Sequence, residues 1–276
     1  MRAGLLQLSV TDDPEENLKV TRALVREAVS GGAGFVLTPE VTNCLSTSRT
    51  HQEEVLRLEE DDATLAALRE DAEDLGVWLL IGSLALKTDD PDGRFANRSF
   101  LVSPDGRVVA SYDKIHMFDV NVSETEQYRE SAGYRPGSRA VVAETPFARI
   151  GMTVCYDVRF PYLYRKLAKA GAEILTIPSA FNETTGRAHW ESLLRARAIE
   201  NGAYVLAPAQ TGEHAARAGR PRRTYGHTLA VAPWGEVLVD AGTEIGVSFV
   251  DIDRAEVEKA RARVPSLQHD RGFEGP

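Results

Sequence analysis

Two segments far apart in the sequence, GAGFVLTPE at 32–40 and GAEILTIPS at 171–179, repeat one arrangement. Each follows a predicted helix and combines Gly-Ala, a short apolar strand and a proline at matching offsets. Short apolar runs bounded by turn residues are typical of strands that are buried on both faces. The repetition therefore predicts two similar halves that face each other, rather than one simple doubly wound sheet.

Apolar strands and amphipathic helices alternate along the rest of the chain. Residues 12–32 predict a helix, with an Asp-Pro start, an acidic first turn and a Gly-Gly stop. Residues 94–114 predict a hairpin around Ser-Pro-Asp-Gly, and residues 227–241 predict a second one. A further helix is expected from about His189 to Asn201. The pattern indicates an α/β protein with helices outside two sheets.

No low-complexity linker divides the chain, so we expect one domain over residues 1–276, with 264–276 as a C-terminal tail. The formal net charge of −9 gives no general attraction for nucleic acid or an anionic membrane. The N-terminal apolar run is too short for a signal peptide, and no segment reaches the roughly 20 apolar residues of a membrane span. Two cysteines make neither a disulfide framework nor a zinc site. These observations predict a reduced, cytoplasmic protein.

Three chemically reactive residues each follow a predicted apolar strand: Glu40, Lys114 and Cys155. Strand ends are where α/β proteins collect catalytic groups, because a rigid core anchors the loops there. A carboxylate can take the proton of a thiol as general base, and an ammonium favours the thiolate and stabilises an oxyanion. The coincidence of all three indicates a cysteine nucleophile, whereas each residue alone would more often be packing or surface.

Other cysteine chemistries fit this sequence less well. A cysteine phosphatase loop places its basic residue six positions after the cysteine, but here Arg159 comes after four. A thioredoxin-like site needs Cys-x-x-Cys, which is absent. A papain-like Cys–His pair stays open, since the chain has six histidines and His116 is near Lys114 in sequence.

The segments LTPE, YDKIHMFDVNV and GMTVCYDVRFP resemble the three signature segments of the nitrilase, or carbon–nitrogen hydrolase, superfamily. The resemblance covers nearly the whole chain and implies a Glu–Lys–Cys triad at Glu40, Lys114 and Cys155. It also implies a four-layer α-β-β-α sandwich and a homodimer formed through helices beside the nucleophile segment. The hypothesis is a metal-free and cofactor-free amidase that forms a thioester with a small-molecule amide.

Later segments resemble the Nit-type amidases of this superfamily. The segments AQTGEH and RTYGH resemble the deaminated glutathione amidase branch more closely, while the segments FDVNV and NETTG would also suit an omega-amidase. The resemblance implies a small substrate that carries a carboxylate. A non-catalytic scaffold and an acyl transferase of the same superfamily are less favoured alternatives.

The resemblance also implies supporting residues. A second acid is expected between the lysine and the cysteine, and among Glu124, Glu126 and Glu130 the Arg-Glu-Ser context selects Glu130. Its expected role is to orient Lys114 and the substrate or water. The backbone N–H of Tyr156 is a candidate oxyanion donor.

Four further residues complete the predicted site. Asp157 and Arg159 are expected to pair and brace the turn after the nucleophile. Thr185 and Arg187 are candidates for substrate binding. Arg187 stands where family members often have proline, so it either adds positive charge near the substrate or only decorates a loop.

Overall fold

The computed structural model describes residues 1–122, 124 and 126–275. Two six-stranded sheets form the centre of the molecule. The first has the order β16-β1-β2-β3-β4-β5, with bounds β16 Gly246–Asp251, β1 Arg2–Gln7, β2 Phe35–Leu37, β3 Trp78–Leu86, β4 Ala96–Val102 and β5 Val108–Asp113. The second has the order β15-β14-β11-β10-β9-β8, with bounds β15 Val237–Asp240, β14 Leu229–Val231, β11 Tyr204–Ala207, β10 Ile174–Thr176, β9 Arg149–Met152 and β8 Val141–Glu144.

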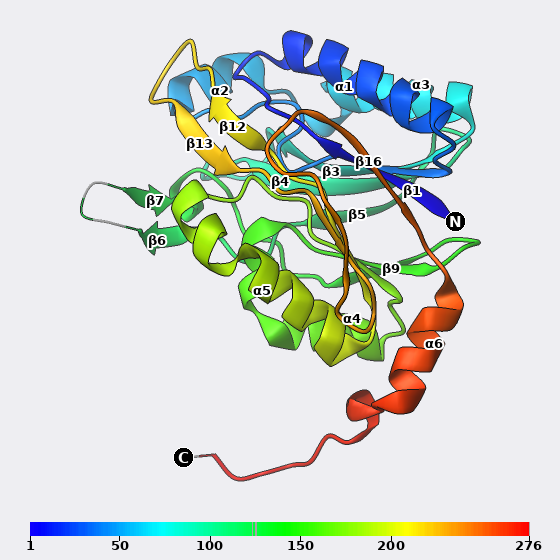
Figure 1. Cartoon of the computed structure of the whole chain (residues 1–276). Coiled ribbons are helices and arrows are strands. Elements are labelled where there is room, and N and C mark those ends of the chain that lie inside the picture. Colours follow the sequence, from blue (N-terminus) through cyan, green and yellow to red (C-terminus); the bar gives the residue numbers. More distant parts are fainter. Residues whose placement is uncertain (123, 125, 276) are drawn as a thin grey trace.

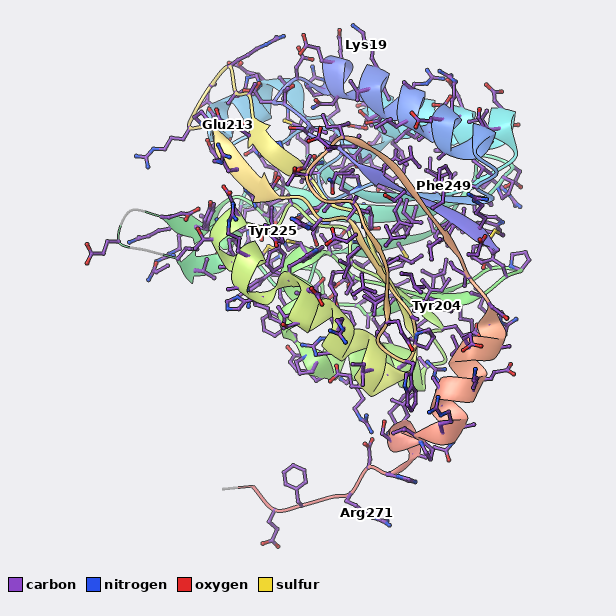
Figure 2. The ribbon with its side chains drawn as sticks, in the orientation of Figure 1. Lys19, Tyr204, Glu213, Tyr225, Phe249 and Arg271 are labelled. Atoms are coloured by element: carbon purple, nitrogen blue, oxygen red, sulfur yellow. The ribbon has the colours of Figure 1, made fainter. Side chains whose placement is uncertain are left out.

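Helices cover the outer faces of the two sheets, so the molecule has four layers (Figure 1). Helices α1 (Pro14–Ser30) and α3 (Ala63–Leu75) lie on the first sheet, and α4 (Pro161–Lys169) and α5 (Glu183–Asn201) lie on the second. The predicted α-β-β-α sandwich is confirmed. Figure 2 shows Lys19 pointing outward from α1, as expected for the solvent face of an outer helix.

The repeated segments occupy equivalent places in the two sheets. Strand β2 pairs in parallel with β1 and β3, and β10 pairs in parallel with β9 and β11. Both strands are completely buried, as their apolar sequences predict. The carboxyl ends of the two strands approach each other, because a methyl group on Gly82 beside β2 would touch both Pro39 O and Pro178.

Helix α1 begins and ends where its sequence predicts. Asp13 caps it by accepting hydrogen bonds from the backbone N–H groups of Glu15 and Glu16, and Gly31 ends it. The hairpins β4–β5 and β14–β15 are also confirmed. One helix boundary was wrong, since α5 begins at Glu183 and not near His189. Asn182 caps this earlier start, where its Oδ1 accepts from Thr185 N at 3.0 Å.

Two small hairpins and a short helix have no counterpart in the sequence predictions. The hairpins are β6–β7 (Asp119–Asn121 and Gln127–Arg129) and β12–β13 (Thr211–His214 and Arg222–Tyr225), and the helix is α2 (Arg49–Val55). Their polar sequences lack the apolar alternation of core strands. They lie at the same end of the sandwich, beside the start of α5 (Figure 1).

The last helix, α6 (Arg254–Arg263), leads away from the sandwich into an extended C-terminal segment (Figure 1). A single 3-10 turn at Ser266–Gln268 interrupts this segment. Pro276, the last residue of the predicted tail, lies outside the described residues. None of the described helices combines the length and apolar composition needed to cross a bilayer.

Candidate active site

Glu40 follows β2, and a tight turn directs it into the space between the sheets. The next residue, Val41, has φ of 50°, which is unusual for a β-branched residue. Ser83 of β3 holds this turn, because its Oγ accepts from Val41 N at 2.8 Å. Gln210 holds it from the other sheet, where its Nε2 donates to the carbonyl oxygen of Glu40 at 3.0 Å.

Lys114 follows β5 at the edge of the same sheet. The register of β4 with β5 places Asn97 opposite Lys114, whose backbone N–H donates to Asn97 O at 2.9 Å. The Lys114 side chain is 2% exposed. The hairpin therefore delivers an ammonium and an amide side chain to one place.

Cys155 follows β9 of the second sheet and opens a 3-10 turn over Cys155–Arg159. Its φ is 48°, a left-handed conformation that a non-glycine residue rarely adopts. The backbone N–H of Cys155 donates to Pro178 O at 3.0 Å, which ties the turn to the end of β10. Strained backbone of this kind clusters at functional sites, because the surrounding structure must fix it there.

Side chains from the first half of the chain and a backbone N–H from the second half meet in one cluster. Lys114 Nζ lies 2.9 Å from Glu40 Oε1 and 2.8 Å from Glu130 Oε2. Asn97 Nδ2 donates to Glu40 Oε1 at 2.9 Å and to Glu130 Oε1 at 3.4 Å. From the second sheet, Ala180 N donates to Glu40 Oε2 at 2.7 Å. Both oxygens of Glu40 are thus fixed by donors that favour the ionised carboxylate.

The charges of the cluster stabilise one another. Burial raises the pKa of Glu40, but Lys114, Arg222 and the Ala180 N–H together outweigh it and lower that pKa below the ordinary value. Burial likewise lowers the pKa of Lys114, but the Glu130 and Glu40 carboxylates reverse the shift and raise it. The free enzyme therefore holds a charged lysine and a charged Glu40.

The thiol of Cys155 is neutral in this resting state. Burial and the Glu40 carboxylate raise its pKa, and Lys114 only partly opposes them. Lys114 lowers the pKa of Cys155, as the sequence predicts for an adjacent ammonium, but burial and Glu40 raise it by more. A group that removes the proton during the reaction is required, and Glu40 is the adjacent carboxylate.

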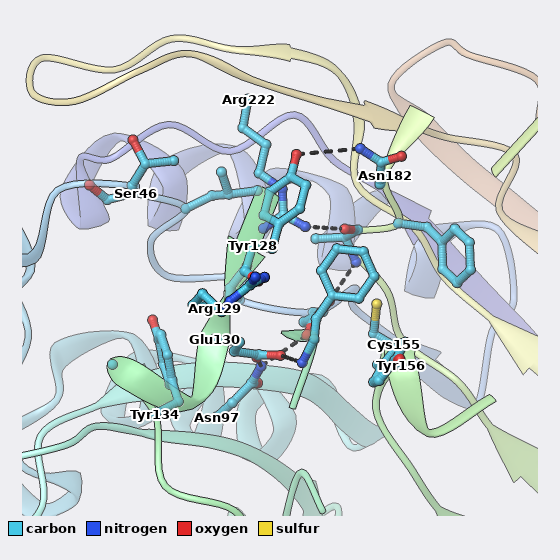
Figure 3. A pocket seen from close by; sticks show the side chains of 18 of the residues that line it. Ser46, Asn97, Tyr128, Arg129, Glu130, Tyr134, Cys155, Tyr156, Asn182 and Arg222 are labelled. Atoms are coloured by element: carbon cyan, nitrogen blue, oxygen red, sulfur yellow. Dashed lines mark hydrogen bonds between the residues drawn. The ribbon is translucent and has the colours of Figure 1, made fainter. Parts of the chain in front are cut away.

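These residues line a cavity of about 1040 Å³, which is large enough for a substrate of several residues. Figure 3 shows Cys155, Glu130 and Asn97 on its wall together with Tyr128, Asn182 and Arg222. The cavity is also lined by Thr185 at the start of α5. Its mixed aromatic and polar wall is typical of a small-molecule site.

Asp157 does brace the turn after Cys155, but not through Arg159. Its carboxylate is completely buried and accepts from Val154 N at 2.9 Å and from Tyr112 OH at 2.7 Å. It also lies 2.6 Å from His116 Nδ1, so this histidine serves the turn instead of pairing with the thiol.

The predicted partner, Arg159, lies beside a different group. Its Nη2 is 3.2 Å from His189 Nδ1 on α5, and no ion pair joins Arg159 to Asp157 in the described structure. Tyr112 and His116 occupy the Asp157 carboxylate instead. The backbone N–H of Tyr156 lies at the start of the turn, where the first amides of a helix have no acceptor within it.

The two candidates for substrate binding have different surroundings. Thr185 lines the cavity, whereas Arg187 is not among the residues described as lining it. Arg187 does not lie on a loop but on α5, where its exposed side chain pairs with Glu183 at 2.8 Å. Of the loop acids, Glu126 accepts from Asn182 Nδ2 at 2.6 Å, and Glu124 is exposed. Glu130 is the acid that contacts Lys114.

Sequence reasoning missed Asn97 and Arg222. Counting back from the turn of the predicted hairpin would not have found Asn97, because a register shift between Leu101 and Val102 moves the pairing by one residue. Arg222 lies on β13, in a strand that the polar sequence did not reveal. In the described parts of the chain, no group of three or more His, Cys, Asp or Glu residues could hold a metal ion.

Comparison with known proteins shows the family of the chain. The carbon–nitrogen hydrolase family profile matches residues 2–262. The chain belongs to the carbon–nitrogen hydrolase family. It is 39% identical to the deaminated glutathione amidase of Yersinia enterocolitica, over 97% of this chain and 92% of that one. This carbon–nitrogen hydrolase is an enzyme that acts on amides.

Solved structures of relatives share its fold. The NitFhit protein of C. elegans superimposes with a TM-score of 0.90 at 33% identity, and the match covers 98% of this hydrolase and 65% of that protein. A variant of the amidase from Nesterenkonia sp. AN1 has a TM-score of 0.77 at 26% identity, over 96% and 98% of the two chains. That relative carries acrylamide added at its active-site cysteine.

Proposed function

We propose that this hydrolase cleaves amides of small carboxylate-bearing acids through a Cys155 thioester, with deaminated glutathione as its substrate. The observation that carries the proposal is the buried Glu40–Lys114–Cys155 cluster on the wall of a large cavity. The relatives named deaminated glutathione amidase support the choice of substrate. The acrylamide adduct of the Nesterenkonia enzyme supports cysteine as the nucleophile.

The reaction begins with transfer of the Cys155 proton to Glu40 as sulfur attacks the amide carbonyl carbon. Because the pKa of the thiol is raised and that of Glu40 is lowered, the proton moves only as the new bond forms. The attack places a negative charge on the carbonyl oxygen. The Lys114 charge and the Tyr156 N–H stabilise that oxyanion.

Collapse of this intermediate breaks the carbon–nitrogen bond. The Glu40 carboxylic acid returns its proton to the departing nitrogen, so the amine leaves neutral and the acyl group stays on sulfur. Glu40 then takes a proton from water, whose oxygen attacks the thioester carbon. Release of the carboxylic acid product returns the proton to the Cys155 sulfur.

Glu130 and Asn97 hold the side chains of Glu40 and Lys114 in position during these proton transfers. Lys114 directs its N–H groups at both carboxylates, so it acts on the oxyanion mainly through its charge. Glu130 balances that charge while Glu40 is transiently protonated. Asp157 holds the turn that carries Cys155 and Tyr156.

The function is tested by incubating the enzyme with deaminated glutathione and following release of cysteinylglycine. Intact-protein mass spectrometry after rapid acid quenching should detect one 2-oxoglutaryl group on the wild type and none on Cys155→Ala. Ammonia release from 2-oxoglutaramate, without cleavage of deaminated glutathione, would replace the proposed substrate with that of an omega-amidase. A stable Cys155→Ala variant with full activity would exclude the nucleophile.

We further propose a cytoplasmic homodimer. Both cysteines are free and buried, which suits a reducing compartment. Tyr162 on α4 and Ile199 on α5 are 57% and 54% exposed, which supports the expected dimer face beside the nucleophile segment. Light scattering after size exclusion should give twice the chain mass, and Ile199→Asp should shift the protein toward monomer.

A further inference from the structure

Arg222 brings a positive charge to the wall of the cavity. It lies on β13 and lines the cavity, with its guanidinium carbon 5.5 Å from the ring centre of Tyr128. Its Nη2 donates to Ala180 O at 2.6 Å (Figure 3). A backbone carbonyl fixes the orientation of this guanidinium but does not neutralise it.

The described carboxylates leave the Arg222 charge unpaired. The Nε of Arg222 is buried and has no acceptor. The adjacent Arg223 is 58% exposed and is paired with Glu183 at 2.9 Å and Glu213 at 3.1 Å. A buried N–H without an acceptor is costly, and an anion bound in the cavity could supply an acceptor for Arg222 Nε.

Arg222 is also connected to the reacting groups. The carbonyl oxygen of Ala180 accepts from Arg222, and the backbone N–H of the same residue donates to Glu40 Oε2 at 2.7 Å. The Arg222 charge lowers the pKa of both Glu40 and Cys155, although other influences are larger. The guanidinium therefore lies within electrostatic reach of the nucleophile and its base.

We propose that Arg222 binds the terminal carboxylate of the acyl group, the part of the substrate that remains attached to the enzyme as a thioester. This inference rests on the proposed function, because it assumes an acyl chain on Cys155. A planar guanidinium suits a carboxylate, since several N–H donors lie in one plane. A short acyl chain places its far end near the nucleophile, whereas the departing amine extends away.

Under this assignment, Arg222 determines specificity for the acyl group of the substrate and does not contact the departing amine. Substrates with the same acyl group and different amines should depend on it equally. Thr185, on the same cavity wall, has no charge and does not offer an equivalent carboxylate contact.

Binding without turnover tests the proposal directly. Calorimetry measures the affinity of 2-oxoglutarate for Cys155→Ala, for Cys155→Ala with Arg222→Gln, and for Cys155→Ala with Arg223→Gln. We expect the Arg222 substitution to weaken binding about 10- to 100-fold, the range for loss of a hydrogen bond to a charged group. The Arg223 substitution should not change the affinity. Equal affinities in all three proteins, or no binding to Cys155→Ala, would overturn the assignment.

Kinetics with two simple amides separates a binding role from a structural one. Glutaramate ends in a carboxylate, and pentanamide has a methyl group in its place. Arg222→Gln should raise KM for glutaramate with little change in kcat, and Arg222→Lys should recover part of the loss. An equal fall in kcat/KM for both amides would mean that Arg222 only positions Ala180 and Glu40.

The outcomes also separate this inference from the proposed substrate. Suppose that the wild type cleaves glutaramate, that Arg222→Gln raises KM for it, and that deaminated glutathione stays intact. The role of Arg222 in carboxylate binding is then supported, and the proposed substrate is wrong. If the wild type and Arg222→Gln cleave deaminated glutathione equally well, the proposed function is supported and the role of Arg222 in carboxylate binding is wrong.

Discussion

Lys114 Nζ lies 2.9 Å from Glu40 Oε1, and both side chains are buried between the two sheets. The two residues follow different strands of one sheet, yet the second oxygen of Glu40, Oε2, accepts a hydrogen bond from Ala180 N of the second half. The Ala180–Glu40 hydrogen bond joins residues that are 140 positions apart in sequence, so the Glu40–Lys114 ion pair is fixed by both halves of the molecule. Its loss should affect stability as well as catalysis.

Lys114→Met should destabilise the protein by about 3–5 kcal/mol, because it leaves the buried Glu40 and the half-buried Glu130 without their cation. Urea denaturation at pH 7 measures this change. Adding Glu130→Gln should recover part of the loss, since one of the uncompensated charges is then removed. Lys259→Met, which breaks an exposed pair with Glu256 on α6, is the control and should cost little. An equally small effect of Lys114→Met would contradict the described cluster.

Asn97→Leu should move the acid limb of the kcat profile to higher pH. Asn97 donates to Glu40, and a hydrogen bond to the charged form of a carboxyl lowers its pKa. Without that donor Glu40 becomes protonated at higher pH, and less of the enzyme has an active base. Ser99→Ala removes a buried hydrogen bond from the same strand without touching Glu40, so its acid limb should not move. A similar shift in both variants would argue against a specific role for Asn97.

His214 should make stability fall as pH decreases below about 6.5. Burial lowers the pKa of His214 from 6.5 to about 4 and the Arg222 charge adds to this shift, although the hydrogen bond from Nδ1–H to Val10 O opposes it. Between those two values the unfolded chain binds the proton and the folded chain does not, so stability is lost as pH falls. The full difference is about 3 kcal/mol. His214→Gln should flatten this slope in urea titrations from pH 7 to 4, whereas His269→Gln in the tail should not.

Gly82→Ala should lower both stability and activity. A methyl group there would overlap the carbonyl oxygens of Thr38 and Pro39, which belong to the strand end that carries Glu40. Overpacking of this kind costs about 1–3 kcal/mol, and relief by movement would displace Glu40. Thermal unfolding and kcat can be measured on the same sample. Gly272→Ala, which meets no atom within 4 Å, is the matched control. A fully active and stable Gly82→Ala variant would contradict the close packing at this strand end.

The sequence predicted the parts of this structure that are governed by apolar periodicity. Strands β2 and β10 are buried apolar runs, and helix α1 has both of its capping signals, so local pattern and final structure agree. Glu40, Lys114 and Cys155 were selected because they follow such strands. Their assignment as catalytic residues stays a prediction.

The other features of the structure depend on contacts between residues far apart in the sequence, which a local sequence pattern does not reveal. The polar strand of Arg222 is held by its pairing with β12, not by an apolar face. The expected Asp157–Arg159 pair fails because Tyr112 and His116 reach the carboxylate from distant positions. The neutral state of the Cys155 thiol follows from burial, which becomes evident only when both sheets surround it.

The left-handed turn at Cys155 has a consequence for the order of folding. Pro178 O holds that turn, and Ala180 N, two residues further along, holds Glu40. A folding intermediate with only one sheet formed would therefore lack either the nucleophile's geometry or its base. Recovery of amide hydrolysis during refolding should lag behind recovery of secondary structure and report the moment when the two halves dock.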